Sequence, residues 1–178
     1  MAWQKRIQPI AIDQFYRKCW PEAKVIELDL DKRSTLAQQI DMGGADKMLK
    51  FPGGGLAFLA QRFRRSYQAR YDDFTLRESR PSGRPTEWGK LLAALTGCGF
   101  LAGYYVYGHV NEREDGFIRM RILKLRELLE ALSRGEFLMH YGNNPDGSST
   151  FAYLPFKSIP AQYLLLDFTE GDSQGKLL

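Results

Sequence analysis

The feature that most constrains the fold is a pair of short apolar segments joined by a glycine-rich turn. Residues 47–51 and 56–64 flank Pro52-Gly53-Gly54-Gly55, a combination typical of two strands and a tight connection. The sequence therefore predicts a β-hairpin. We interpret the three glycines as a turn and not as a phosphate-binding loop, because they lead into a strand and not into a helix.

Length and composition favour one folded domain. The chain has 178 residues, of which 44% are hydrophobic and 13% aromatic, enough to bury a core. We expect a single domain over 1–169 and a disordered tail over 170–178. Cys19 and Cys98 provide neither a disulfide framework nor metal-ligand spacing, which suits a reducing cytosol. Because we find no signal sequence and no apolar run long enough to span a membrane, a cytoplasmic location is expected.

The remaining segments alternate between helical and extended patterns. Helices are predicted over 10–20, 34–40, 86–97 and 125–132, with Thr86 as a cap. Strands are predicted over 24–30, 74–77, 100–110 and 117–123, followed by two final strands around a turn at 142–149. This order predicts an α/β (α+β) fold with a central mixed β-sheet flanked by helices.

Positive charge is concentrated in one segment. Between residues 62 and 84 seven arginines face three acidic residues, a local excess of +4 that equals the net charge of the chain. The planar guanidinium suits phosphate, so we expect a nucleic-acid partner, DNA in particular. A solvated arginine-rich face is the alternative. The residues expected to bind nucleic acid are Arg65, Arg70, Arg77, Arg80, Arg84 and Lys90.

Two oxygen-bearing side chains lie on the predicted hairpin. Asp46 opens its first strand and Gln61 lies on the second. Their oxygens suit Mg²⁺ or Mn²⁺, and the adjacent Arg62 and Arg64 could stabilise phosphate charge. The candidate catalytic set is therefore Asp46, Gln61, Arg62 and Arg64, with the first two as metal ligands. The simpler interpretation is a turn-forming aspartate and a solvent-facing glutamine.

The stretch from Gln39 through Gly44-Ala45-Asp46 to Gln61-Arg62-Phe63-Arg64 resembles the PD-(D/E)XK nuclease superfamily, over about residues 33–125. The resemblance implies a restriction-endonuclease-like fold and magnesium-dependent phosphodiester hydrolysis. Asp46 matches the metal-binding aspartate, and Gln61 matches the following Glu or Gln. Phe63 stands where the family has a lysine. Arg62 and Arg64 belong to the strand face opposite Gln61, because side chains alternate along a strand.

Other polar residues are weaker candidates. Gln38, Gln39 and Asp41 precede the hairpin and could reach the same site, and Asp72 and Asp73 are either ligands or turn residues. Glu87 and Lys90 share one face of the predicted helix after residue 86, where they either face the site or form a surface ion pair. We interpret His109 and His140 as structural residues, because neither has a partner at ligand spacing.

Three functions are compatible with these patterns. The first is a metal-dependent nuclease acting on DNA. The second is a non-catalytic descendant of that fold that binds nucleic acid or a protein, which the replacement of the lysine by Phe63 favours. The third is a structural or assembly protein with a basic surface, which predicts a solvent-exposed Asp46. The sequence leaves the oligomeric state open and is compatible with a homodimer.

Overall fold

The computed structural model describes residues 2–28, 45–97, 100–171 and 176–177. Within these ranges the larger sheet has seven strands in the order β1-β2-β3-β5-β6-β9-β10. Their bounds are β1 Lys24–Glu27, β2 Lys47–Lys50, β3 Leu56–Arg64, β5 Tyr104–Val110, β6 Phe117–Lys124, β9 Leu164–Thr169 and β10 Lys176–Leu177. The pair β3–β5 is parallel and the others are antiparallel, so the sheet is mixed, as predicted.

The predicted hairpin is confirmed as β2 and β3. Lys47 pairs with Leu59 and Lys50 with Leu56, and the five residues between the strands form the turn. Gly54 has φ +82°, a conformation that a residue with a Cβ rarely adopts. Leu49 and Leu59 are both fully buried on the same face, which fixes the register of the pair.

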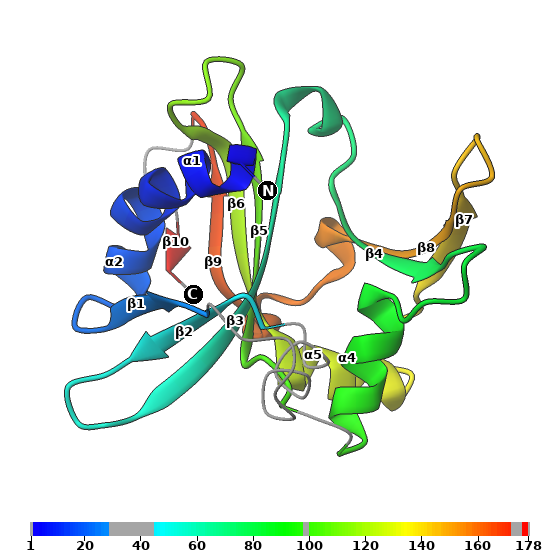
Figure 1. Cartoon of the computed structure of the whole chain (residues 1–178), viewed down its shortest axis with the longest axis horizontal. Coiled ribbons are helices and arrows are strands. Elements are labelled where there is room, and N and C mark those ends of the chain that lie inside the picture. Colours follow the sequence, from blue (N-terminus) through cyan, green and yellow to red (C-terminus); the bar gives the residue numbers. More distant parts are fainter. Residues whose placement is uncertain (1, 29–44, 98–99, 172–175, 178) are drawn as a thin grey trace.

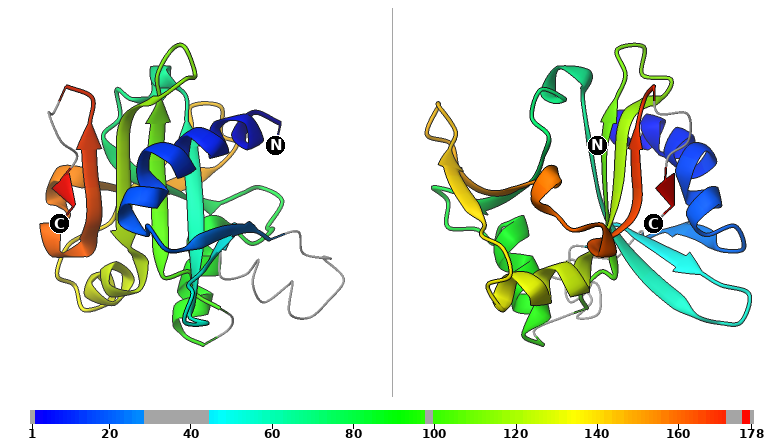
Figure 2. Two further views of the ribbon diagram at one scale, coloured as in Figure 1. Left: turned by 90° about the vertical axis from the view of Figure 1, so that its left-hand side faces the viewer. Right: turned by 180° about the vertical axis from the view of Figure 1, so that it is seen from behind.

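One face of the larger sheet is covered by the N-terminal helix (Figures 1 and 2). It is formed by α1 Ala2–Ala11, a π-helical segment Ile12–Tyr16 and α2 Arg17–Cys19. The sequence predicted only residues 10–20, whereas the helix already begins at Ala2 and contains Pro9. Ile7, Phe15 and Tyr16 are buried against the sheet, so tertiary packing outweighs the local signal.

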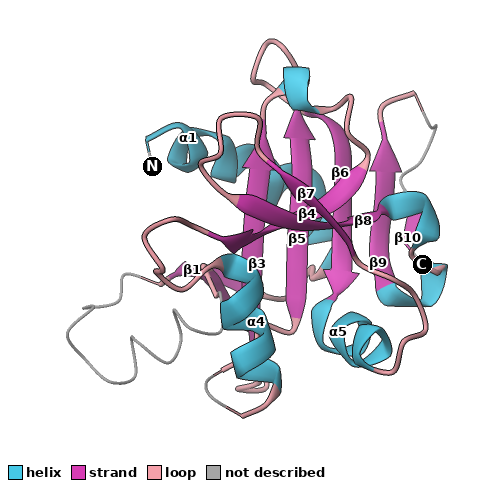
Figure 3. Ribbon diagram, turned by 90° about the vertical axis from the view of Figure 1, so that its right-hand side faces the viewer, coloured by secondary structure: helices cyan, strands magenta, loops and turns pink. Residues whose placement is uncertain are grey.

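The other face carries a smaller sheet of three strands, β4 Asp73–Ser79, β8 Thr150–Pro155 and β7 His140–Asn143, in the order β4-β8-β7. Figure 3 shows these strands crossing in front of the larger sheet. The sequence predicted a strand over 74–77 within one central sheet, but β4 belongs to this second sheet. It pairs instead with β8, whose residues lie far along the chain, and no local pattern encodes such a pairing.

Helices α4 Glu87–Leu95 and α5 Leu125–Ser133 lie on the same side as the smaller sheet (Figure 1). Thr86 caps α4 as predicted, accepting a hydrogen bond from the Gly89 N–H at 3.4 Å. The second core lies between these elements and the larger sheet and includes Phe74, Leu76 and Leu128. None of the described helices is long and apolar enough to cross a membrane.

The last part of the chain holds strands that the sequence did not predict. Short 3-10 helices occur here at Phe156–Ser158 and Ala161–Tyr163, and β9 follows the second of them. A further 3-10 helix, Ser66–Gln68, lies earlier in the chain, between β3 and β4. Strand β9 pairs with β6, and β10 pairs with β9. Lys176 and Leu177, within the segment expected to be a disordered tail, are therefore paired residues, which corrects that prediction at these two positions.

Candidate functional site

Asp46 immediately precedes β2 and makes two hydrogen bonds with β3. Its main-chain N–H donates to the Leu59 carbonyl at 2.7 Å, and its carboxylate accepts from the Gln61 N–H at 2.8 Å. The Gln61 N–H lies beyond the last β2–β3 pair, Lys47 with Leu59. The carboxylate thus extends the ladder past the end of β2, because it supplies the acceptor that a further strand residue would have supplied.

The Gln61 side chain turns toward the N-terminal helix. Its Oε1 accepts a hydrogen bond from the Tyr16 hydroxyl at 3.0 Å, and Tyr16 is almost fully buried in the apolar core on that face. Burial raises the pKa of Tyr16, which keeps the phenol protonated as a donor. Gln61 is therefore a structural contact between the sheet and the helix.

The side-chain oxygens of Asp46 and Gln61 have hydrogen-bond partners within the protein. One carboxylate oxygen of Asp46 binds a main-chain N–H, and the amide oxygen of Gln61 binds a phenol. Within the described ranges no group of three or more His, Cys, Asp or Glu is placed to hold a metal. The Mg²⁺ or Mn²⁺ site at Asp46 and Gln61 stays a prediction. Gln38, Gln39 and Asp41 lie outside the described residues.

Arg62 and Arg64 leave β3 on the face opposite Gln61, as strand alternation predicts. Arg62 donates to the Glu87 carboxylate and, at 3.4 Å, to the Thr75 carbonyl. The same carboxylate accepts from the Arg77 N–H at 3.2 Å. Glu87 therefore connects β3, β4 and α4. The expectation that this helix directs a polar side chain toward β3 agrees with this contact.

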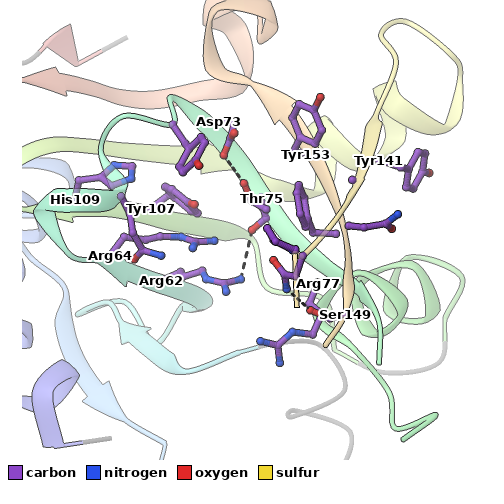
Figure 4. Close-up of a pocket in the computed structure, with 17 residues that line it drawn as sticks. Arg62, Arg64, Asp73, Thr75, Arg77, Tyr107, His109, Tyr141, Ser149 and Tyr153 are labelled. Atoms are coloured by element: carbon purple, nitrogen blue, oxygen red, sulfur yellow. Dashed lines mark hydrogen bonds between the residues drawn. The ribbon is translucent and has the colours of Figure 1, made fainter. Parts of the chain in front are cut away.

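A cleft of about 720 Å³ lies between the two sheets, directly over Arg62 and Arg64. The larger sheet lines it with Tyr107 and His109 beside the two arginines, and the smaller sheet lines it with Asp73, Thr75, Arg77, Phe151 and Tyr153. Figure 4 shows Arg62, Arg64, Tyr107 and His109 on one side and Tyr153 on the other. Gln68, Tyr71 and the β7–β8 loop complete the rim.

Two arginines in this cleft are not neutralised. The guanidinium of Arg64 lies over the Tyr107 ring, 5.6 Å from its centroid, and its Nε is buried without a hydrogen-bond partner. Within the described part of the chain, neither Arg64 nor Arg77 has a carboxylate at ion-pair distance. Arg62, by contrast, is paired with Glu87. Positive charge therefore faces the cleft from both sheets, and an anion could neutralise it.

His109 lies at the inner end of this arginine group and is 2% exposed. Burial, together with Arg64 and Arg119, lowers its pKa to about 4. The imidazole is therefore neutral near pH 7 and can both donate and accept hydrogen bonds. From the sequence we interpreted this histidine as structural. In the structure it also lines the cleft.

The other arginines of the charged segment lie apart from the cleft lining. Arg65 lies over the Trp3 ring, 5.0 Å from its centroid, and pairs with Glu114 at 3.2 Å. Arg70 lies over Tyr71 near the rim, at 4.8 Å. Arg80 and Arg84 belong to the loop after β4, and Lys90 belongs to α4. Of the six residues expected to bind nucleic acid, only Arg77 is part of the lining.

Several cleft residues carried no functional signal in the sequence. Tyr107 and His109 belong to an aromatic-rich strand whose composition is typical of a buried core strand. Phe151 and Tyr153 lie much later in the chain, on β8. Asp72, expected as a turn residue or ligand, pairs with Arg121 at 3.2 Å and Arg119 at 3.4 Å. The alternation of Tyr105, Tyr107 and His109 along β5 was the one local hint of a polar aromatic face.

Comparison with known proteins adds no further assignment. No protein-family model matches the chain, and neither a curated protein nor a solved structure matches it.

Proposed function

We propose that this protein binds nucleic acid, with DNA as the expected form, in the cleft between its two sheets, and that it does so without cleaving it. The observation that carries this proposal is the pair Arg64 and Arg77, which face one cleft from opposite sheets with no carboxylate partner in the described chain. Guanidinium groups bind phosphate oxygens through two parallel hydrogen bonds, so such a pair favours a phosphodiester backbone.

The aromatic lining favours the same class of ligand. Phe151 and Tyr153 follow each other at a spacing of two along β8, which places both rings on the cleft side of the smaller sheet. Proteins that bind nucleic-acid strands combine a basic groove with aromatic rings on which bases stack. A phosphate-only ligand would make no use of these rings.

Binding is proposed in preference to cleavage because the expected catalytic residues have other contacts. Asp46 and Gln61 hold β3 in place, and Phe63 is buried against Phe117 with ring centroids 5.2 Å apart. Arginine side chains such as those of Arg62 and Arg64 are poor general bases.

The test is fluorescence anisotropy with labelled DNA and RNA, comparing the wild type with Arg64→Gln/Arg77→Gln. We expect the double variant to bind at least tenfold more weakly and to lose about one to two units of the logarithmic salt dependence. Arg17→Gln is the matched control, because Arg17 is an exposed arginine on the opposite side of the larger sheet. Equal losses in both variants would contradict a binding role for the cleft.

Cleavage is measured in the same samples with Mg²⁺ or Mn²⁺ added. We expect no cutting by the wild type. Metal-dependent cutting that disappears in Asp46→Ala would overturn the non-catalytic proposal and restore the nuclease.

A further inference from the structure

The cleft is enclosed on two sides, which limits the form of nucleic acid that can enter it. Its volume of about 720 Å³ lies within the range of pockets that enclose a drug-sized molecule, roughly 300–1,000 Å³. A double helix is far larger and could touch only the rim. Arg64, Tyr107 and His109 line the wall that the larger sheet provides, and Tyr107 and His109 there are each 2% exposed.

Aromatic rings lie both inside this cleft and at its rim. Phe151 and Tyr153 are half-buried on the inner face of β8, and Tyr71 at the rim is 55% exposed. The Phe151 ring lies across Gly142, where a Cβ would approach it to 2.6 Å. The close approach of β7 that glycine permits thus leaves space for the ring. In a duplex the base faces are covered by their neighbours, so rings placed here can stack only on unpaired bases.

Polar groups complete the inner wall without adding charge. The neutral His109 lies beside Arg64, Asn143 at the end of β7 lines the cleft, and Ser149 lines it from the β7–β8 loop. Such groups can bind the hydrogen-bonding edge of a base, which becomes available only when the base is unpaired. The phosphate-binding arginines on both walls would hold the backbone on either side of that base.

We propose that the cleft takes unpaired nucleotides of a single strand, with phosphates at Arg64 and Arg77 and bases against Tyr71, Phe151 and Tyr153. This inference rests on the proposed nucleic-acid binding and specifies its substrate class. Single-stranded DNA and single-stranded RNA share the chemistry used here, so both are included as probes. A blunt DNA duplex of the same sequence is the contrasting probe.

The experiment measures the affinity of a labelled 15-nucleotide oligo-dT, the matching oligo-U RNA and a blunt dA·dT duplex. We expect the wild type to bind oligo-dT at least tenfold more tightly than the duplex. The variant Tyr71→Leu/Tyr153→Leu keeps apolar volume but removes two aromatic faces. We expect it to bind oligo-dT about tenfold more weakly, because stacking of a base on an aromatic ring is lost at two positions.

Two controls separate stacking from other effects. Tyr71→Phe/Tyr153→Phe keeps both rings and should bind oligo-dT like the wild type. Tyr67→Leu changes a tyrosine that is 68% exposed and lies outside the cleft lining, and it should leave the affinity unchanged. Unfolding curves of the leucine double variant establish that it is folded in the assay.

The outcomes distinguish this inference from the proposed function. Duplex binding equal to or tighter than oligo-dT binding, lost in Arg64→Gln/Arg77→Gln, would overturn the single-strand inference and leave nucleic-acid binding intact. Unchanged oligo-dT affinity in the leucine double variant would overturn the stacking role. If the wild type binds none of the three probes, both proposals are overturned. Comparison of oligo-dT with oligo-U decides between DNA and RNA, because only RNA presents 2′-hydroxyl groups.

Discussion

The two faces of the larger sheet use the same strands for different purposes. Along β3, Leu59 and Phe63 face the N-terminal helix in an apolar core, whereas Arg62 and Arg64 face the smaller sheet and the cleft. Along β5, Val106 and Val110 belong to the first face and Tyr107 and His109 to the second. Alternation in two adjacent parallel strands thus places the apolar residues together and the polar aromatic residues together.

The two faces also differ in the surroundings of their polar and charged side chains. On the helix-covered face Tyr16 donates to Gln61, and the buried amide of Gln8 on α1 makes no hydrogen bond. The cleft face retains a buried Arg64 Nε without a partner and a histidine held neutral by its surroundings. Groups of this kind are expected at binding sites, where a ligand supplies the missing partner.

The largest effect should come from placing a charge on the helix-covered face. Phe63→Lys restores the lysine that the nuclease resemblance implies, but Phe63 is 5% exposed and packs on Phe117. A lysine there would be a buried, unpaired cation, and we expect the free energy of unfolding to fall by about 3–5 kcal/mol. Urea unfolding measures it, with Leu56→Lys on the same strand as the control because Leu56 is 55% exposed. A stable, metal-dependent nuclease would refute this expectation.

The next effect concerns the cleft face and depends on pH. His109 has a pKa of about 4 in the fold, against about 6.5 in the unfolded chain. Between these values the unfolded chain binds more protons, so stability is fully present above pH 6.5 and falls as the pH drops toward 4. The loss approaches about 1.4 kcal/mol per pH unit at most.

His109→Gln removes this titration and keeps a polar side chain of similar size. We expect the difference in unfolding free energy between wild type and variant to change with pH from 6.5 to 4. A constant difference across this range would mean that His109 keeps an ordinary pKa.

A smaller effect on stability is expected at the end of the β2–β3 pairing, where Asp46 contacts β3. Asp46→Ala removes the acceptor of the Gln61 N–H, and we expect unfolding to become easier by about 1–3 kcal/mol. Asp46→Asn keeps an acceptor oxygen and should recover part of this loss. Thermal unfolding of both variants provides the measurement. An unchanged stability of Asp46→Ala would show that the carboxylate does not hold this edge.

The smallest stability effect should accompany a large loss of binding. Arg64→Gln removes a cation that lies near His109 and makes no ion pair in the described chain, so we expect its unfolding free energy to change by less than about 1 kcal/mol. Its affinity for oligo-dT should nevertheless fall severalfold. Parallel urea and anisotropy measurements test this. A loss of stability comparable to that of Phe63→Lys would remove the distinction between the two faces.

Local patterns predicted the elements better than they predicted their partners. The hairpin of β2 and β3 and the cap at Thr86 were evident, because glycine turns and helix caps act over a few residues. Strand β9 was not predicted, and β4 was assigned to the wrong sheet. Their neighbours lie far along the chain and leave no periodic signal.

The candidate site was predicted in part for the same reason. Strand alternation correctly placed Arg62 and Arg64 opposite Gln61, since side-chain direction is a local property. The cleft itself could not be predicted, because it depends on how the smaller sheet folds over the larger one. Tyr107 and Tyr153 meet only through that packing. Hydrogen bonds such as that from the Tyr16 hydroxyl to Gln61 also require the tertiary structure.

The pairing of β4 with β8 has a consequence for the order in which the protein acquires its cleft. The hydrogen bond from Thr150 Oγ1 to the Glu78 carboxylate joins residues 72 positions apart. During synthesis from the N-terminus, strands β2, β3, β5 and β6 of the larger sheet can pair while β8 has not yet been translated. The arginines of β3 would therefore be exposed on a growing chain before the opposing wall arrives. Closure of that long loop carries an entropic cost that delays contacts of this kind in folding. The cleft is thus expected to form only after the early strands of the larger sheet have paired.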